Sequence, residues 1–207
     1  MAIEDFYGFI VSAILISFSG VMSPGPFFAV TISKGLENKF SGIIISLGHG
    51  VVEFPLMFLI YYFGVTWLKE SVILSKTISF VGGAILIYMG IQMLKRRKEK
   101  TQSSPYLKYG IFVAGILATA TNPYFLMWWT TVGINLVGQA ANFQFIGFVI
   151  FTIVHWSCDL IWNTVVSLTV FKSKRLWTKK VHDIVFGFCF LVFVGFGAWF
   201  TISAFFW

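Results

Sequence analysis

Long apolar runs separated by short polar breaks make up most of the chain. A helix needs about 20 mostly apolar residues to cross the hydrocarbon core of a bilayer. Six runs meet this requirement, at 6–33, 42–66, 73–94, 109–136, 143–171 and 181–206. None alternates apolar and polar residues with the period of a strand, and backbone in lipid must satisfy its own hydrogen bonds. The pattern therefore predicts an all-α, polytopic membrane protein with six transmembrane helices.

Composition supports this fold class. The chain has 207 residues, of which 57% are hydrophobic and 11% are charged, whereas about 25% of an ordinary soluble domain is charged. This excludes a soluble globular domain, a disordered chain and a disulfide-rich secreted module. The first run follows Glu4 and Asp5 rather than a basic segment, so we expect it to be a retained span and not a cleaved signal peptide.

The basic residues predict an orientation in the membrane. The first, third and fifth loops between the runs hold two, six and five Lys or Arg residues. The fourth loop holds none, and the second holds Lys69, with Lys76 just inside the following run. Because cytoplasmic loops are enriched in Lys and Arg, both termini are expected outside, with the chain in the plasma or inner membrane. This distribution accounts for the net charge of +7, so no nucleic-acid partner is expected. We also expect no cofactor.

The chain divides into two halves of three runs each. The most basic loop, at 95–108, separates residues 1–94 from residues 109–207 within one membrane domain. Two halves with an odd number of spans face opposite ways across the membrane. We therefore expect a 3+3 inverted repeat, an arrangement that is typical of secondary transporters.

Helix-breaking residues interrupt the first run of each half. The interrupting segments are Ser23-Pro24-Gly25-Pro26 and Thr121-Asn122-Pro123. Proline removes a helical hydrogen bond and crowds the carbonyl four residues earlier, so Pro123 is expected to free the Thr119 carbonyl for a solute. Broken helices at matching positions of two repeats indicate a binding site near the middle of the bilayer, although each break could instead be a packing kink. All seven residues are therefore candidates for substrate binding.

A histidine followed four residues later by an acid occurs in the second run of each half. The first pair is His49 and Glu53, and the second is His155 and Asp159. A spacing of four places each pair on one face of its helix. A carboxylate at this depth costs at least about 2.5 kcal/mol, so it is paired, protonated or next to water. We expect the four residues to couple transport to a proton or another cation; the alternative is a structural ion pair or hydrogen bond that locks two helices together.

These motifs resemble those of the LysE-type amino-acid exporter family, over essentially the whole chain. The resemblance is carried by the Pro-Gly-Pro at 24–26, the glycines that follow it and the Asn-Pro at 122–123; Tyr124 then stands where many members have Lys. The resemblance implies a secondary active transporter, and no enzyme, that exports amino acids or related small solutes and that can form a homo-oligomer. Two buried acids suit a basic or zwitterionic solute.

Two alternatives from other classes use the same residues. The wider superfamily includes exporters of divalent metal ions, and His49, Glu53, His155 and Asp159 could supply metal ligands. An intramembrane hydrolase with a dyad of Ser23 and His155 is the second alternative. The chain has neither a Gly-x-Ser-x-Gly nor a His-Glu-x-x-His motif, which argues against the hydrolase.

Overall fold

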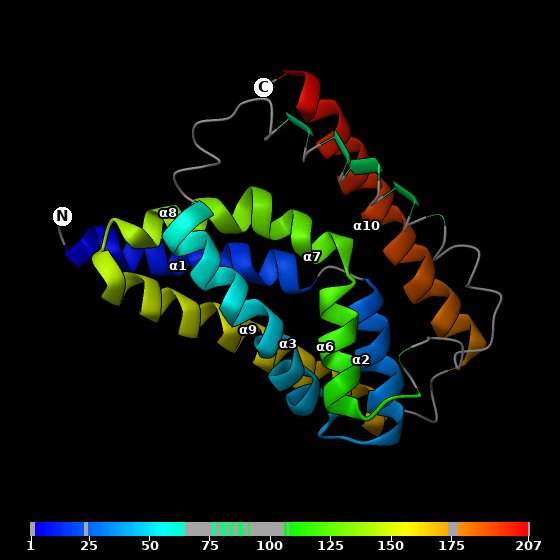
Figure 1. Ribbon diagram of the computed structural model, residues 1–207. Coiled ribbons are helices and arrows are strands. Elements are labelled where there is room, and N and C mark those ends of the chain that lie inside the picture. Colours follow the sequence, from blue (N-terminus) through cyan, green and yellow to red (C-terminus); the bar gives the residue numbers. More distant parts are fainter. Residues whose placement is uncertain are drawn as a thin grey trace.

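The described part of the protein is all-helical. The computed structural model describes residues 3–22, 25–64, 106, 108–173 and 178–206, with short pieces between 76 and 91. Within these residues there is no strand. The helices form a bundle in which segments from both halves of the chain lie side by side (Figure 1). Apart from residues 106 and 108, the basic loop at 95–108 lies outside the described residues, as does most of the predicted third span.

The first predicted span consists of two helices. Helix α1 covers Ile3–Val21 and helix α2 covers Pro26–Glu37. Gly25 is the N-cap of α2 and Pro26 is its first residue, a position that proline favours because the missing N–H would have no partner inside the helix. Pro26 therefore begins a new helix instead of distorting a continuous one.

The fourth predicted span is also interrupted. Helix α6 (Ile111–Ala120) ends before Asn122, and α7 (Pro123–Trp128) begins with Pro123. The Asn122 side chain caps α7 by accepting a hydrogen bond from the Tyr124 N–H at 3.2 Å. The chain continues through a π-helical turn, η2 (Trp129–Gly133), into α8 (Ile134–Ala141), and the two parts of this span are bent by 57°.

This geometry changes the expected role of Pro123. The Thr119 carbonyl was predicted to be free for a solute, but it accepts a hydrogen bond from the Asn122 N–H at 3.0 Å. The prediction was wrong because Pro123 begins a helix and the turn before it satisfies this oxygen.

Three further helices complete the described fold. Helix α3 (Ser41–Leu59) continues into the π-helical turn η1 (Ile60–Gly64), α9 covers Gln144–Lys172 and α10 covers Lys179–Phe206. Residues Ser41–Gly64 and Gln144–Lys172 are each long and apolar enough to cross a membrane, and the bent fourth span makes a third if it is counted as one. The number six remains a prediction.

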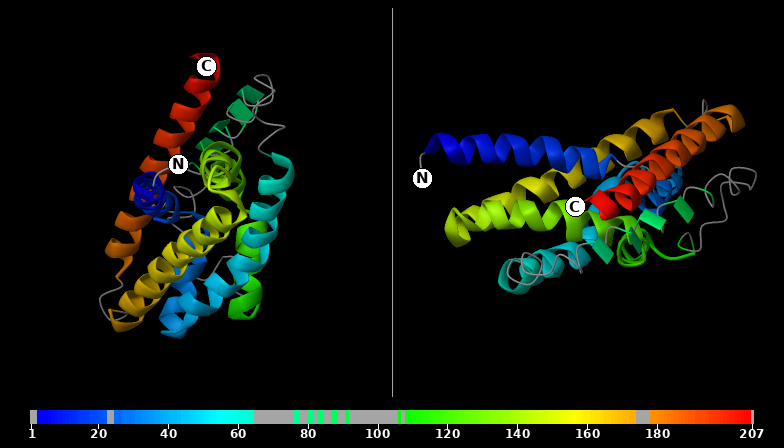
Figure 2. Two further views of the ribbon diagram at one scale, coloured as in Figure 1. Left: turned by 90° about the vertical axis from the view of Figure 1, so that its left-hand side faces the viewer. Right: turned by 90° about the horizontal axis from the view of Figure 1, so that it is seen from above.

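Helix α3 lies at the centre of the bundle and packs against α6 and α9, helices of the opposite half of the chain. Glycines make this packing close. Gly48 lies against the Phe112 carbonyl of α6, Gly115 of α6 lies against Ile45, and Gly42 lies against the Asn163 carbonyl of α9. Helix α10 lies at one side of the bundle and contacts the short pieces between 76 and 91, for example through Phe80 and Phe205 (Figure 2).

Candidate functional site

Four titratable side chains from two helices meet inside the bundle. They are His49 and Glu53 of α3, and His155 and Asp159 of α9. None is more than 5% exposed. The two helices come from opposite halves of the chain, so the fold brings the repeated His and acid pairs into one group, called here the four-residue cluster.

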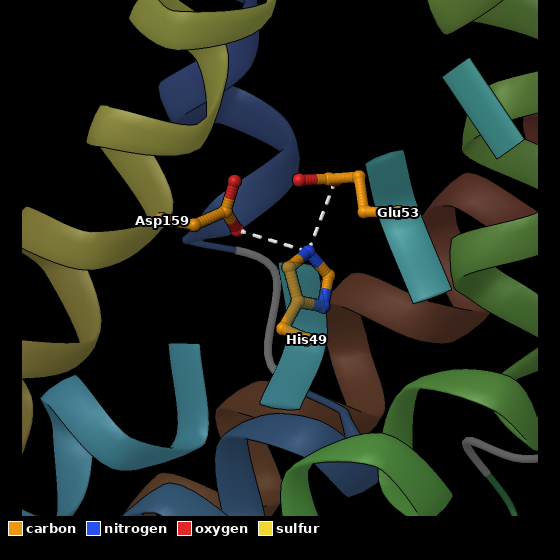
Figure 3. A group of neighbouring side chains, drawn as sticks. All are labelled: His49, Glu53 and Asp159. Carbon is orange, nitrogen blue, oxygen red and sulfur yellow. Dashed lines mark hydrogen bonds and ion pairs between the residues drawn. The ribbon is translucent and has the colours of Figure 1, made fainter. Parts of the chain in front are cut away.

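The shortest contacts in the cluster involve one oxygen of Glu53. Its Oε1 lies 3.0 Å from His49 Nε2 and 3.3 Å from His155 Nε2. Asp159 is slightly farther away, with Oδ1 at 3.6 Å from His49 Nε2 and Oδ2 at 3.7 Å from His155 Nε2. Figure 3 shows the His49 ring facing the carboxyl groups of Glu53 and Asp159.

Contacts within and between the two helices connect all four residues. His49 and Glu53 of α3 form a hydrogen bond, as their spacing predicts. His155 is hydrogen-bonded to Glu53 of the other helix and forms a longer ion pair, at 3.7 Å, with Asp159 of its own. Both imidazole Nε2 atoms therefore face the same two acids, which makes the cluster one electrostatic unit.

Hydroxyl groups hold the other nitrogen of each histidine. His49 Nδ1 is 2.9 Å from Thr119 Oγ1 of α6, and His155 Nδ1 is 2.7 Å from Ser17 Oγ of α1. The Thr119 hydroxyl donates its hydrogen to the Gly115 carbonyl, so its oxygen can only accept from His49. His49 therefore carries a hydrogen on Nδ1.

Replacing Thr119 should show how much this contact holds His49 in place. We expect Thr119→Val to lower the free energy of unfolding by about 1–3 kcal/mol, because a buried imidazole N–H loses its acceptor. Thr119→Ser keeps the hydroxyl and should be much less destabilising. Thermal unfolding of the purified protein measures the difference, with Thr130→Val, at an exposed hydroxyl bonded to the backbone of its own helix, as the control. Equal destabilisation by Thr119→Ser and Thr119→Val would contradict the contact.

Two tryptophans at the junction of α7 and η2 surround the cluster. Trp129 is 1% exposed, and its Nε1–H donates to Glu53 Oε1 at 3.3 Å. The Trp128 ring stacks on the His155 ring with 5.1 Å between centroids. Gly20 of α1 leaves the space that Trp128 occupies, since a Cβ there would lie 2.6 Å from Trp128 Nε1. π-Helical turns are frequent at functional sites, and here the turn positions Trp129 against an acid.

A cavity opens beside the cluster, between the two helix breaks. Its empty volume is about 510 Å³ when the open solvent at its mouth is included. All four residues of the cluster line it, together with Gly25 and Asn122 from the two breaks. The rest of the wall includes the aromatic side chains of Phe27, Tyr124, Phe125, Trp128 and Trp129.

The remaining predicted site residues are placed differently. Thr121 is exposed and its hydroxyl donates to the Leu117 carbonyl, so it does not line the cavity. Pro26 and Pro123 begin α2 and α7 beside the lining residues Gly25 and Asn122. Ser23 and Pro24 lie outside the described residues.

The structure adds residues to the site that the sequence did not single out. Ser17 and Thr119 touch the histidines, and Trp128 and Trp129 enclose the cluster. Their polar groups act across helices, and no spacing along one helix indicates which partner they meet. Their only signal in the sequence is their closeness to the two breaks.

Broken helices around a cavity that is lined by buried titratable groups are features of a membrane transport protein. Comparison with known proteins agrees. The profile of the LysE type translocators matches residues 18–204, and the chain belongs to this family. Its fold class, transport role and membrane context follow from that membership.

Curated relatives include the leucine efflux proteins of Salmonella choleraesuis and Salmonella typhimurium. Each is 24% identical to this chain over 205 residues, an alignment that covers 94% of this chain and 93% of the relative. No solved structure matches the chain. As a member of a translocator family, the protein is a transporter of small solutes and not an enzyme, so the Ser23 and His155 dyad is not a catalytic site.

Proposed function

We propose that the protein is a secondary active exporter of amino acids, which bind in the cavity between the two helix breaks. The observation that carries the proposal is the convergence of both breaks and of the whole four-residue cluster on one cavity. Curated relatives that cover nearly the whole chain are leucine efflux proteins. Amino-acid export is the function that both observations favour.

The lining of the cavity favours a zwitterionic amino acid with an apolar side chain. The carboxyl groups of Glu53 and Asp159 provide negative charge for an ammonium group, and the aromatic wall provides an apolar surface for a side chain such as that of leucine. A basic amino acid would place its second positive charge against this wall. We therefore rank neutral apolar solutes above the basic ones that the sequence left equally open.

We further propose that export is coupled to a proton or another cation at the four-residue cluster. The cluster lines the cavity directly, so a solute and a cation would meet the same two acids. Coupling through one shared site requires only that the two occupants affect each other's binding.

The proposed architecture is the 3+3 inverted repeat with both termini outside. Reciprocal contacts support it: His49 of the first half binds a hydroxyl of α6 in the second, and His155 of the second half binds a hydroxyl of α1 in the first. Both hydroxyls lie on the helix before a break. Repeats related by a twofold axis would give this exchange.

Transport in proteoliposomes tests the function. We expect radiolabelled leucine to move across the membrane when a pH or sodium gradient is imposed, and to move much more slowly without one. The flux of lysine under the same gradient shows how well a basic solute is transported, and protein-free vesicles give the background flux. Flux of neither amino acid under any gradient would contradict the proposal. Gradient-driven flux of radioactive zinc without amino-acid flux would instead favour the metal exporter.

A further inference from the structure

We propose that the four-residue cluster is a binding site for one divalent transition-metal ion such as Zn²⁺, with His49, Glu53, Asp159 and His155 as its ligands. This goes beyond amino-acid export, and it does not depend on which solute is carried. One ligand atom from each of His49, Glu53 and Asp159 already lies within 4.8 Å of the other two.

The spacing of the ligand atoms suits a tetrahedral ion. Zinc bound at about 2.0–2.2 Å requires ligand atoms roughly 3.3–3.6 Å apart. The four contacts between imidazole Nε2 and carboxyl oxygen atoms measure 3.0, 3.3, 3.6 and 3.7 Å. These contacts use both oxygens of Asp159, and His155 is not part of the group of three that already meets, so His155 or Asp159 would have to shift for one atom of each residue to reach the same ion.

The cluster also has coordinating atoms without a hydrogen-bond partner. Glu53 Oε2 and Asp159 Oδ2 are buried, and neither forms a hydrogen bond within the described residues. Burying an oxygen of this kind without a partner is costly. A metal ion in the cluster would use this free coordinating capacity.

The groups around the cluster orient His49 so that its Nε2 atom can bind a metal ion. Because Thr119 can only accept from Nδ1, a neutral His49 has its lone pair on Nε2, the nitrogen that faces the acids. Histidine ligands of metals are commonly held in this way through their second nitrogen. His155 Nδ1 likewise contacts a hydroxyl, that of Ser17, at 2.7 Å.

A divalent ion would replace protons in the cluster. The hydrogen bonds from the imidazole Nε2 atoms to Glu53 place hydrogens on these nitrogens, and a metal ion displaces such protons when it binds. The two neutral imidazoles and two ionised carboxylates that result carry two negative charges, which the ion neutralises. Mixed imidazole and carboxylate ligands suit zinc, whereas magnesium prefers oxygen ligands and retains water. The site is therefore expected to discriminate between the two ions.

Calorimetry of the purified protein tests the site. We expect one Zn²⁺ to bind per chain and no detectable Mg²⁺ binding. His49→Gln and Asp159→Asn should each weaken zinc binding at least tenfold. His182→Gln changes the one histidine outside the cluster, which lies in α10, and should bind zinc like the wild type. Helix content by circular dichroism confirms that each variant is folded.

Cobalt provides a measurement that needs no variant. We expect Co²⁺ to bind the wild-type protein with the intense visible absorption of four-coordinate cobalt, and Zn²⁺ to displace it. The proposal is overturned if the wild type binds neither metal, or if zinc binding survives both substitutions in the cluster. Because no step involves transport, a failure here is distinct from a failure of the proposed export.

Discussion

Removing both buried acids together, by Glu53→Gln with Asp159→Asn, is expected to reduce gradient-driven amino-acid flux to the level of protein-free vesicles. The two carboxyl groups are the buried acids that line the cavity, and the proposed coupling requires their charge. The amides keep the size and hydrogen-bonding capacity of the side chains, and changing both avoids leaving one charge without the other. Flux is measured in proteoliposomes under the imposed gradient.

The matched control makes the same chemical changes outside the cavity. Glu4→Gln with Asp5→Asn replaces two exposed acids in the first turn of α1 and should leave flux unchanged. Thermal unfolding of both double variants separates lost coupling from lost folding. If the Glu53 and Asp159 double variant is folded and transports at the wild-type rate, the proposed coupling site is wrong.

The second large effect concerns the glycines between α3 and α6. Gly48→Ala places a Cβ against the Phe112 carbonyl, and Gly115→Ala places one 2.6 Å from the Ile45 carbonyl. Neither contact can be relieved by turning a side chain, because both neighbours are backbone atoms. We expect each substitution to lower the free energy of unfolding by about 3 kcal/mol or more. This is the upper end of the usual cost of overpacking.

Gly8→Ala is the matched control for these variants. Gly8 lies on the exposed side of α1, and nothing lies within 4 Å of the place its Cβ would take. Alanine there should leave stability unchanged or raise it by up to about 1 kcal/mol, since alanine favours helix more than glycine does. Thermal unfolding in detergent compares the three variants. Equal stability of Gly48→Ala and Gly8→Ala would contradict the close packing of α3 on α6.

The sequence predicted contacts between residues of the same helix better than contacts between residues of different helices. The spacing of His49 and Glu53 was enough to predict their hydrogen bond, because residues four apart share a helix face. The same rule brought His155 within 3.7 Å of Asp159, but it did not predict that His155 Nε2 lies nearer to Glu53, at 3.3 Å. The distance between α3 and α9, which glycine packing sets, decided that contact.

The geometry of the helix breaks was also only partly predictable from the sequence. Proline and asparagine marked where both helices end, but the sequence did not tell whether each proline lay inside a helix or at the start of the next. Asn122 caps α7, whereas Gly25 has no side chain with which to cap α2. The hydrogen bonds from the histidines to Ser17 and Thr119 depend on where these helices end. They could therefore not be predicted from the sequence.

The close backbone contacts of α3 with α6 and α9 have a consequence for how a solute could reach the cavity. These three helices carry both acids, both histidines and Thr119, and the glycine contacts leave them little room to slide or separate. Helix α2 is held in the same way, because its Gly35 lies against the backbone of Ser167 in α9. An entrance would then have to be made by α1 or α7. These segments could then move while the charged groups of the cluster keep their positions.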